Sequence, residues 1–398
     1  MIPIIKKDNL TYLVGETLVS RPLEPYAPIV CDFLHELSVV LLSSKESAHY
    51  PDVMVFALWC HKDNIIKLKE KFSDGKIRMG RGLAFHIAPS NVPVNFAFSL
   101  AFGFLAGNAN IIRVSSTSFA QVDIICSAIN KLLENNRYHE IKEMLAIVKY
   151  EQNDEITAAF SANCQSRIIW GGNATIRNIR KLPIPERAVE ITFADRYSFC
   201  IIDAPSIIKL TDTELLKLAE NFYNDNYSMD QNACASAHLI IWQGKEKDRA
   251  KERFWTTVAK IVAKKYQFTE IKAVDKYTLF CRNAIELDNI EQFKKYDNYV
   301  YCLKLSNLPM NMDTLRGVFG YFYEYDLDNT DQLIQIITSK YQTLTYFGID
   351  KKRLSDFVTK NRLPGIDRIV PIGKALAITP IWDGYDVVKT LSRIIDIQ

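Results

Sequence analysis

The feature that most constrains the fold of this chain is a regular alternation of short apolar segments and amphipathic ones between residues 83 and 180. Each short segment is followed by a stretch with apolar residues at helical spacing. Buried strands separated by helices specify a parallel sheet with helices on both faces, so we predict an α/β fold. The strands are predicted at 83–87, 110–114, 145–148 and 167–170, and the helices at 94–105, 119–133, 156–162 and 174–180.

A second region with its own strands and helices begins after residue 202. Because a chain of 398 residues is too long for one simple core, we predict two domains. The first covers 1–204, to which the tail 376–398 can return, and the second covers 205–375. The second region is predicted to contain helices at 213–223, 245–265 and 330–338 and strands at 238–242, 300–305, 320–325 and 368–372, and the tail is predicted to contain a final helix at 385–395.

Composition and charge indicate an ordinary soluble globular protein. The chain is 48% hydrophobic and 24% charged, and its net charge is +3. Its Lys and Arg residues are scattered, which argues against nucleic acid as the main partner. The eight cysteines form no CxxC pair and show no metal-ligand spacing, so we expect free thiols, no metal and a cytoplasmic location. The opening apolar run is too short for a secretory signal.

Residues 87–112 contain no charged side chain and are numerous enough to span a bilayer. However, this segment contains two prolines and four asparagines, and polar amides are costly on a helix that faces lipid. We therefore predict a buried strand, turn and helix rather than a membrane span.

The turn that follows the strand 83–87 has candidate functional residues. Ala88, Pro89 and Ser90 lie where ligands bind in open α/β sheets. Pro89 and Pro93 restrict the backbone around Asn91, and a preorganised amide of this kind can stabilise an oxyanion. Alternatively, Asn91 is the N-cap of the next helix.

Two other strand ends could bind a phosphorylated cofactor. Arg113 could hold a phosphate through forked hydrogen bonds, assisted by Ser115 and Ser116, although an Arg beside serines is also a common surface feature. Gly171 and Gly172 precede a predicted helix, where backbone N–H groups can approach a pyrophosphate. Any tight turn would also use such glycines.

Cys234 differs from the other cysteines because small and polar residues surround it. This setting gives a thiolate nucleophile room for a bulky acyl group, whereas cysteines within apolar runs are expected to be structural. His238 is either a base or a satisfied structural histidine. Glu190 and Asp195 flank a strand end, where a carboxylate could act as a base or remain solvated.

Several short motifs occur together and in a fixed order. They are HIAPSNVP (86–93), LAGNAN (105–110), WGGN (170–173), QNAC (231–234), DRIVPIGKAL (367–376) and WDGYD (382–386). With these motifs the chain resembles the aldehyde dehydrogenase superfamily. Within it, the chain is similar to the long-chain acyl-CoA reductase family of the bacterial bioluminescence fatty-acid reductase complex.

The resemblance implies a cofactor domain, a catalytic domain and a small oligomerisation element. Cys234 matches the acylated nucleophile and Asn91 the oxyanion amide. Arg113 matches a Lys that binds the adenosine ribose or its phosphate. Ser116 stands where NAD-preferring relatives often have a Glu, which favours NADPH.

Two positions depart from the superfamily pattern. Glu190 is the only residue that can correspond to the usual general base, so that role is in doubt. Gly317 replaces a Glu that holds the nicotinamide ribose. A weakened base suits a thioester reductase, which has no need of an activated water.

The resemblance implies NADPH-dependent reduction of a long-chain acyl thioester to a fatty aldehyde through an acylated Cys234. The acyl donor would be acyl-CoA or an acylated carrier or partner enzyme. A homo-oligomer, within a fatty-acid reductase complex, is also implied. Two alternatives stay open: another superfamily activity, such as a semialdehyde dehydrogenase or acyl-phosphate reductase, and a non-catalytic subunit of the complex.

Overall fold

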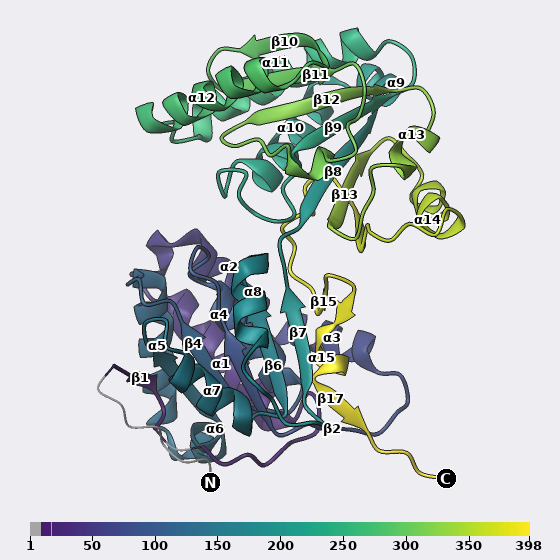
Figure 1. Cartoon of the computed structure of the whole chain (residues 1–398). Coiled ribbons are helices and arrows are strands. Elements are labelled where there is room, and N and C mark those ends of the chain that lie inside the picture. Colours follow the sequence, from purple (N-terminus) through teal and green to yellow (C-terminus); the bar gives the residue numbers. More distant parts are fainter. Residues whose placement is uncertain (1–8, 17) are drawn as a thin grey trace. The chain divides into compact units, whose positions relative to one another are not determined.

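The computed structural model describes residues 9–16 and 18–398, which form two compact units (Figure 1). Unit 1 contains the described residues up to Ala194 together with Ile378–Gln398, and unit 2 contains Asp195–Ala377. The predicted end of the first domain at residue 204 is too late, because β8 (Tyr197–Asp203) pairs with two strands of unit 2.

Within its described residues, unit 1 is built on a six-stranded sheet in the order β1-β5-β4-β3-β6-β7. The edge strand β1 is antiparallel to β5, and the remaining neighbours are parallel. The predicted parallel sheet is thus confirmed. The strands are β1 (Thr11–Val14), β3 (Leu83–Ile87), β4 (Ala109–Val114), β5 (Leu145–Lys149), β6 (Ser166–Trp170) and β7 (Val189–Phe193).

Helices pack on the sheet of unit 1 and enclose an apolar core. They are α1 (Pro28–Ser43), α2 (Pro51–Trp59), α3 (Lys62–Phe72), α4 (Asn95–Leu105), α5 (Ala120–Leu133), α6 (His139–Glu143), α7 (Asp154–Asn163) and α8 (Asn173–Arg180). Every residue of α4 from Phe96 to Leu105 is buried, which explains why this segment has no charge. Among the described helices, none has the length and apolar character needed to cross a membrane.

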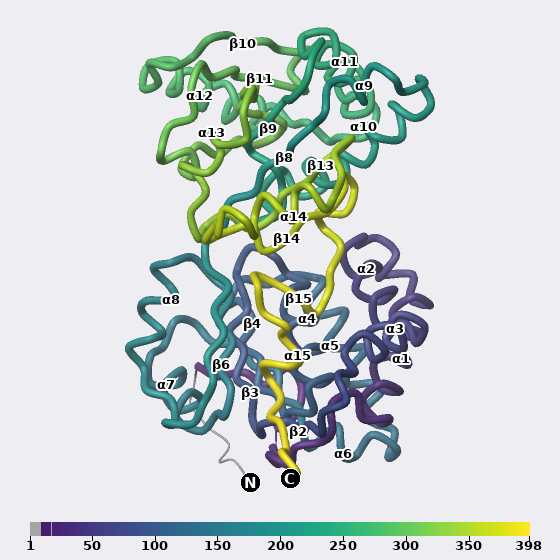
Figure 2. Tube along the Cα trace, turned by 90° about the vertical axis from the view of Figure 1, so that its right-hand side faces the viewer, coloured from purple at the N-terminus to yellow at the C-terminus, as the bar shows by residue number. Residues whose placement is uncertain are grey.

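The C-terminal segment returns to unit 1, where Figure 2 shows it in yellow. It contains β15 (Ile381–Trp382), β16 (Tyr385–Asp386), α15 (Val387–Thr390) and β17 (Ser392–Ile394). The predicted helix 385–395 is therefore wrong. Its apolar residues are buried over a single turn, after which the backbone pairs with β2 (Arg78–Gly80) instead.

The sheet of unit 2 has seven strands within the described chain, in the order β10-β11-β12-β9-β8-β13-β14. The edge strand β10 is antiparallel to β11, and the other pairs are parallel. The sequence analysis did not predict β10 or β13, which contain polar residues along much of their length. The strands that follow β8 are β9 (Leu239–Gln243), β10 (Ile290–Tyr296), β11 (Val300–Leu305), β12 (Tyr321–Leu327), β13 (Tyr341–Phe347) and β14 (Arg368–Pro371).

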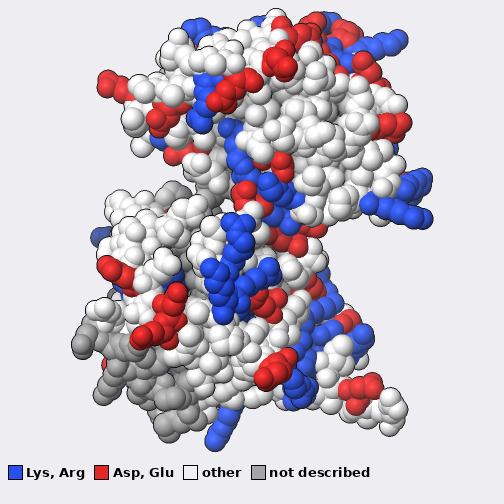
Figure 3. Space-filling view, in the orientation of Figure 1, with Lys and Arg blue, Asp and Glu red and all other residues white. Residues whose placement is uncertain are grey.

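The predicted helix 330–338 is reduced to one turn, α13 (Asp331–Ile334), and a helix that was not predicted, α12, follows α11. Figure 3 shows positive and negative side chains interspersed on the face that it draws of each unit. The remaining helices of unit 2 are α9 (Ala204–Lys209), α10 (Asp212–Asn226), α11 (Lys247–Lys265), α12 (Glu270–Glu286) and α14 (Lys351–Lys360).

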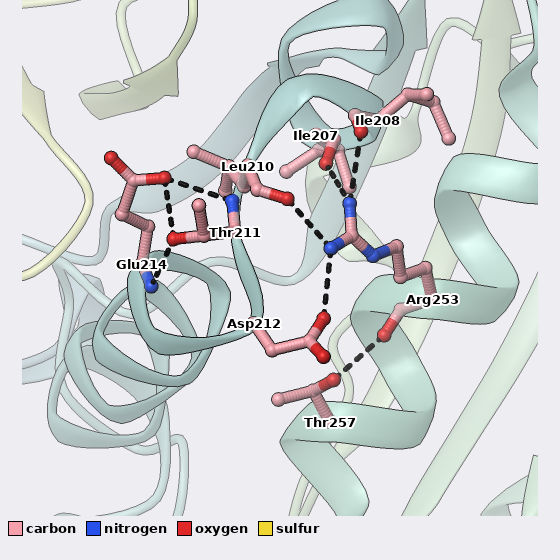
Figure 4. A network of polar contacts seen from close by, with 8 residues as sticks. All are labelled: Ile207, Ile208, Leu210, Thr211, Asp212, Glu214, Arg253 and Thr257. Atoms are coloured by element: carbon pink, nitrogen blue, oxygen red, sulfur yellow. Dashed lines mark hydrogen bonds and ion pairs between the residues drawn. The ribbon is translucent and has the colours of Figure 1, made fainter.

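A polar network fixes the start of α10 (Figure 4). Thr211 and Glu214 form a reciprocal capping box there. Arg253 of α11 pairs with Asp212 and donates to the carbonyl of Leu210 at 2.6 Å. Because the chain leaves the other end of α10 toward Cys234, this network anchors the helix that leads to the candidate nucleophile.

Candidate active site

The cofactor-binding residues predicted from sequence come together at one edge of the unit 1 sheet. The central strand β3 pairs with β4 on one side and β6 on the other, so the strand order changes direction between β3 and β6. Ligands of open α/β sheets bind at such a switch point, beyond the carboxyl ends of the strands. Ala88, Pro89 and Ser90 follow β3, and Gly171 and Gly172 follow β6. Both turns therefore flank this point.

Arg113 lies beside the same turn, because the N–H of Ala88 donates to its carbonyl at 3.0 Å. The guanidinium is 4.8 Å from the ring centre of Tyr150 and donates to the Tyr150 carbonyl. Its Nε atom is buried and has no hydrogen-bond partner among the described residues. Ser115 is half-buried and Ser116 exposed. A cation with unused donor capacity beside two serines fits a phosphate of a dinucleotide.

The turn after β6 offers backbone donors. Gly172 is the N-cap of α8 and contributes no side-chain cap to the N–H groups of the first turn. A Cβ atom at Gly172 would meet nothing within 4 Å. The open N-terminus of α8 therefore suits a phosphate.

Asn91 is exposed in the turn after β3. The N-cap of α4 is Val94, so the alternative role of Asn91 as a helix cap is not observed. Asn91 belongs to unit 1 and Cys234 to unit 2.

Glu190 lies on β7 and forms two ion pairs. One carboxylate oxygen accepts from Nε of Arg167 at 2.7 Å, and the other accepts from Nε of Arg180 at the same distance. Arg167 is 2% exposed and lies opposite Glu190 in the sheet. Glu190 thus neutralises a buried guanidinium. Asp195, the other carboxylate near this strand end, forms an ion pair with Arg316.

Cys234 is half-buried in the loop between α10 and β9. Gln231, which adopts a positive φ of 64°, donates from its buried amide to the carbonyls of Ala237 and Tyr321. The N–H of Ala237 donates to the side chain of Asn226. These buried amides fix both sides of the loop and hence the position of the thiol.

The sulfur of Cys234 accepts a hydrogen bond from Nε2 of Gln342, at 3.4 Å. Gln342 lies on β13 and is 4% exposed. The carbonyl of Cys234 accepts from Ser198 at 2.6 Å. Gln342 was not predicted from sequence, because the polar residues Gln342, Thr343 and Thr345 concealed the strand on which it lies.

A partly buried cation, Arg368, and a buried acid, Asp225, lie next to this loop. Burial lowers the pKa of Arg368, and the negative charges of Asp225 and Cys234 oppose that shift, so the guanidinium is within electrostatic reach of a thiolate. Burial raises the pKa of Asp225 to about 6, although its carboxylate accepts from the N–H groups of Gly373 and Ala375. The segment 367–376 is therefore attached to the end of α10.

His238 is buried, stacks on Tyr197, and contacts the carbonyl of Gly317 at 3.2 Å. Burial lowers its pKa to about 3, so it is neutral at physiological pH and has a structural role.

A Cβ atom at Gly317 would lie 1.7 Å from the carbonyl oxygen of Tyr321, which excludes a larger residue. In residues 9–16 and 18–398, no cluster of three or more His, Cys, Asp or Glu side chains could hold a metal ion.

Comparison with known sequences decides the family. The sequence family described as acyl-CoA reductase (LuxC) matches residues 63–276, more than half of the chain. The chain belongs to the LuxC family. The resemblance predicted from the motifs is thus confirmed.

The long-chain acyl-protein thioester reductase of Photorhabdus laumondii is one curated protein that is similar in sequence to this chain. It is 25% identical over 327 residues, which cover 79% of this chain and 63% of that protein. The long-chain acyl-protein thioester reductase of Vibrio harveyi is 22% identical over 328 residues, with the same coverage. This LuxC-family chain therefore spans 63% of the length of these two relatives.

Solved structures of aldehyde dehydrogenases share the fold. A benzaldehyde dehydrogenase from Corynebacterium glutamicum has a TM-score of 0.61 at 12% identity, covering 93% of this chain and 84% of that one. A lactaldehyde dehydrogenase from Escherichia coli has a TM-score of 0.59 at 12% identity, covering 87% and 79%. The predicted aldehyde dehydrogenase-like fold is confirmed.

Proposed function

We propose that this LuxC-family chain reduces a long-chain acyl thioester to a fatty aldehyde through a thioester on Cys234. The observation that carries the proposal is the setting of the thiol: Cys234 is accessible, accepts an N–H from Gln342 and lies near the charge of Arg368. Donors and cations around a cysteine favour the thiolate, which is the nucleophile. The half-buried Cys31 instead donates to the carbonyl of Tyr26, and burial raises its pKa to about 11 despite the nearby charge of Lys69.

The reaction begins when the Cys234 thiolate attacks the carbonyl carbon of the acyl thioester. The family resemblance assigns the resulting oxyanion to the backbone N–H of Cys234 and the side-chain amide of Asn91. The bond from the acyl carbon to the carrier sulfur then breaks, and its electron pair leaves with that sulfur. The acyl group is now bound to Cys234, and the carrier takes up a proton as a free thiol.

When bound, the nicotinamide cofactor supplies a hydride to the acyl carbon. Breakage of the bond to the Cys234 sulfur then releases the aldehyde and restores the thiolate. Arg113, Ser115 and Ser116 would hold the adenosine end, and the turns at Ala88–Ser90 and Gly171–Gly172 the phosphates. Since no carboxylate stands at position 116 to repel a 2′-phosphate, we infer that the cofactor is NADPH.

The acyl donor is a proposal drawn from the relatives. Their names specify an acyl-protein thioester, and the family description specifies acyl-CoA. In both, the reacting group is the same acyl–sulfur bond. We infer a cytoplasmic homo-oligomer that receives its acyl group from acyl-CoA or from an acylated partner enzyme of a fatty-acid reductase complex.

Glu190 has a structural role in this scheme. Its two ion pairs with Arg167 and Arg180 support that inference. Reduction of a thioester requires no water to be deprotonated beside the acyl-enzyme, so the chemistry proceeds without a carboxylate base.

The test is to incubate the protein with long-chain acyl-CoA that carries a radiolabelled acyl group. We expect a protein-bound label that hydroxylamine removes and that NADPH releases as aldehyde. Cys234→Ala should abolish both, whereas Cys281→Ala, which removes another half-buried thiol, should abolish neither. Full labelling of the Cys234→Ala protein would refute the assignment, and absence of both label and aldehyde would favour a different superfamily activity.

A further inference from the structure

The contact between Gln342 and Cys234 occurs at an irregularity in the unit 2 sheet. The register between β13 and β8 shifts between Tyr341 and Leu344, which are the residues that bracket Gln342 and Thr343. Bulges of this kind redirect a side chain and are frequent beside active sites. Here the shift accompanies a buried side-chain amide whose Nε2 lies 3.4 Å from the Cys234 sulfur.

The same irregularity is joined to Cys234 a second time, through Ser198. The N–H of Thr343 donates to the Ser198 hydroxyl at 3.1 Å, and that hydroxyl donates to the Cys234 carbonyl at 2.6 Å. The Thr343 hydroxyl also donates to Oε1 of Gln342 at 3.2 Å, which fixes the orientation of the amide. The backbone and the sulfur of Cys234 are therefore both held by β13 and β8.

A buried amide is costly unless its hydrogen-bonding groups have partners. A neutral thiol sulfur is a weak acceptor, and a thiolate is a strong one. The hydrogen bond from Gln342 to Cys234 is therefore strongest when the sulfur is a thiolate. The sulfur is a thiolate before it attacks the acyl donor, and again when it leaves as the aldehyde forms.

We propose that Gln342 is a further catalytic residue: its side-chain N–H holds the Cys234 sulfur as a thiolate, both before acylation and as the aldehyde leaves. This inference rests on the proposed function of Cys234. Because the amide has no basic group, it takes no proton; the thiol proton passes to solvent.

Other charged groups around the thiol must stay constant during the test. Arg368 of β14 and Asp225 of α10 both affect the local field. Burial raises the pKa of Asp225 to about 6, so measurements from pH 7 upward are made with this carboxylate mostly ionised.

The experiment measures the rate of Cys234 alkylation by iodoacetamide against pH, in the full chain, with peptide mass spectrometry to separate the eight cysteines. The variants are Gln342→Leu, which removes the donor, and Gln342→Glu, which keeps the shape and adds a repelling charge. Thr345→Val is the matched control, because Thr345 is buried on the same strand and donates to the carbonyl of Phe199 instead.

In Gln342→Leu the midpoint of the pH profile should rise by about one pH unit, as expected for one lost hydrogen bond to a charged group. The limiting rate at high pH should rise about threefold, because a more basic thiolate is more nucleophilic. Mere loosening of the fold would not produce this pair of changes. Gln342→Glu should raise the midpoint further, and Thr345→Val should leave it unchanged.

The inference is overturned if both Gln342 variants keep the wild-type profile, or if Thr345→Val shifts it equally. If Gln342→Leu does not fold, Gln342→Glu decides alone. Acyl labelling of the wild type in parallel separates the two claims. Label on Cys234 with unchanged profiles removes only the role of Gln342. Absence of label from Cys234 removes the proposed function, and the role of Gln342 with it.

Discussion

The substitution Glu190→Gln tests whether the Glu190 carboxylate stabilises the fold or acts as a general base in catalysis. Arg167 is 2% exposed, and its guanidinium donates to Glu190, to Ser161 at 3.2 Å and to the carbonyl of Leu182 at 2.8 Å. Glu190 is the only carboxylate paired with Arg167 among the described residues. The substitution keeps an oxygen acceptor but leaves the buried positive charge without a counterion.

The size of the effect follows from this geometry. Loss of one partner from a buried ion pair costs about 3–5 kcal/mol. Gln retains one acceptor and the Glu190 side chain is 15% exposed, so we expect a cost slightly below this range, about 2–3 kcal/mol. The pair with Arg180, whose side chain is 56% exposed, adds at most about 1 kcal/mol. For a unit of about 200 residues, this total of about 2–4 kcal/mol should lower the melting temperature by roughly 4–16 °C.

Thermal unfolding of Glu190→Gln measures this change, and acyl-enzyme formation and hydrolysis are followed on the same sample at a temperature where it is folded. Both reactions should be largely retained. Glu186→Gln is the control, because Glu186 is exposed four residues earlier. An unchanged melting temperature with a loss of ~10²–10⁴-fold in hydrolysis would refute the structural role and establish a general base.

Three further predictions concern other residues. Ser116→Glu should lower the ratio of kcat/KM for NADPH over NADH by repulsion of the 2′-phosphate, and a wild type that already prefers NADH would contradict the cofactor assignment. Gly317→Ala should destabilise unit 2, seen as a lower melting temperature, because the new Cβ would lie 1.7 Å from the Tyr321 carbonyl oxygen; a stable variant would contradict the packing. The melting temperature should fall from pH 6.5 toward pH 4, because burial lowers the pKa of His238 to about 3 and the unfolded chain therefore binds a proton first as pH falls. His238→Asn should flatten that part of the profile if this origin is right.

The sequence predicted β3, β4, β5 and β6 of the unit 1 sheet well, because these parallel strands are largely apolar runs, whereas β7 contains Glu190 and Thr192 and was not predicted. β3 and β6 are buried along their whole length, and such strands stand out between amphipathic helices. The polar turns after these strands could be located for the same reason. Their convergence on one point depends only on strand order, which follows from the topology of a doubly wound sheet.

Polar strands escaped prediction because their pattern depends on tertiary contacts. β13 contains Gln342, Thr343 and Thr345, which are buried only because Cys234, Ser198 and neighbouring carbonyls satisfy them. The final helix was predicted wrongly for a related reason. Val387, Val388 and Leu391 have helical spacing, but the edge of β2 offers the following backbone a strand partner.

The arrangement of charge around Cys234 is consistent with exchange of one thioester for another, rather than hydrolysis. Attack by a thiolate on a thioester expels a second thiolate, so the acylation step needs groups that stabilise charge on sulfur and needs no base for water. Gln342 and Arg368 meet the first requirement near the thiol. Glu190, the one carboxylate that the superfamily pattern would assign to water activation, has both oxygens committed to arginines of unit 1. Under the proposed function, an acyl-enzyme on Cys234 would be protected because no carboxylate activates water beside it, and the acyl group would persist until it is reduced.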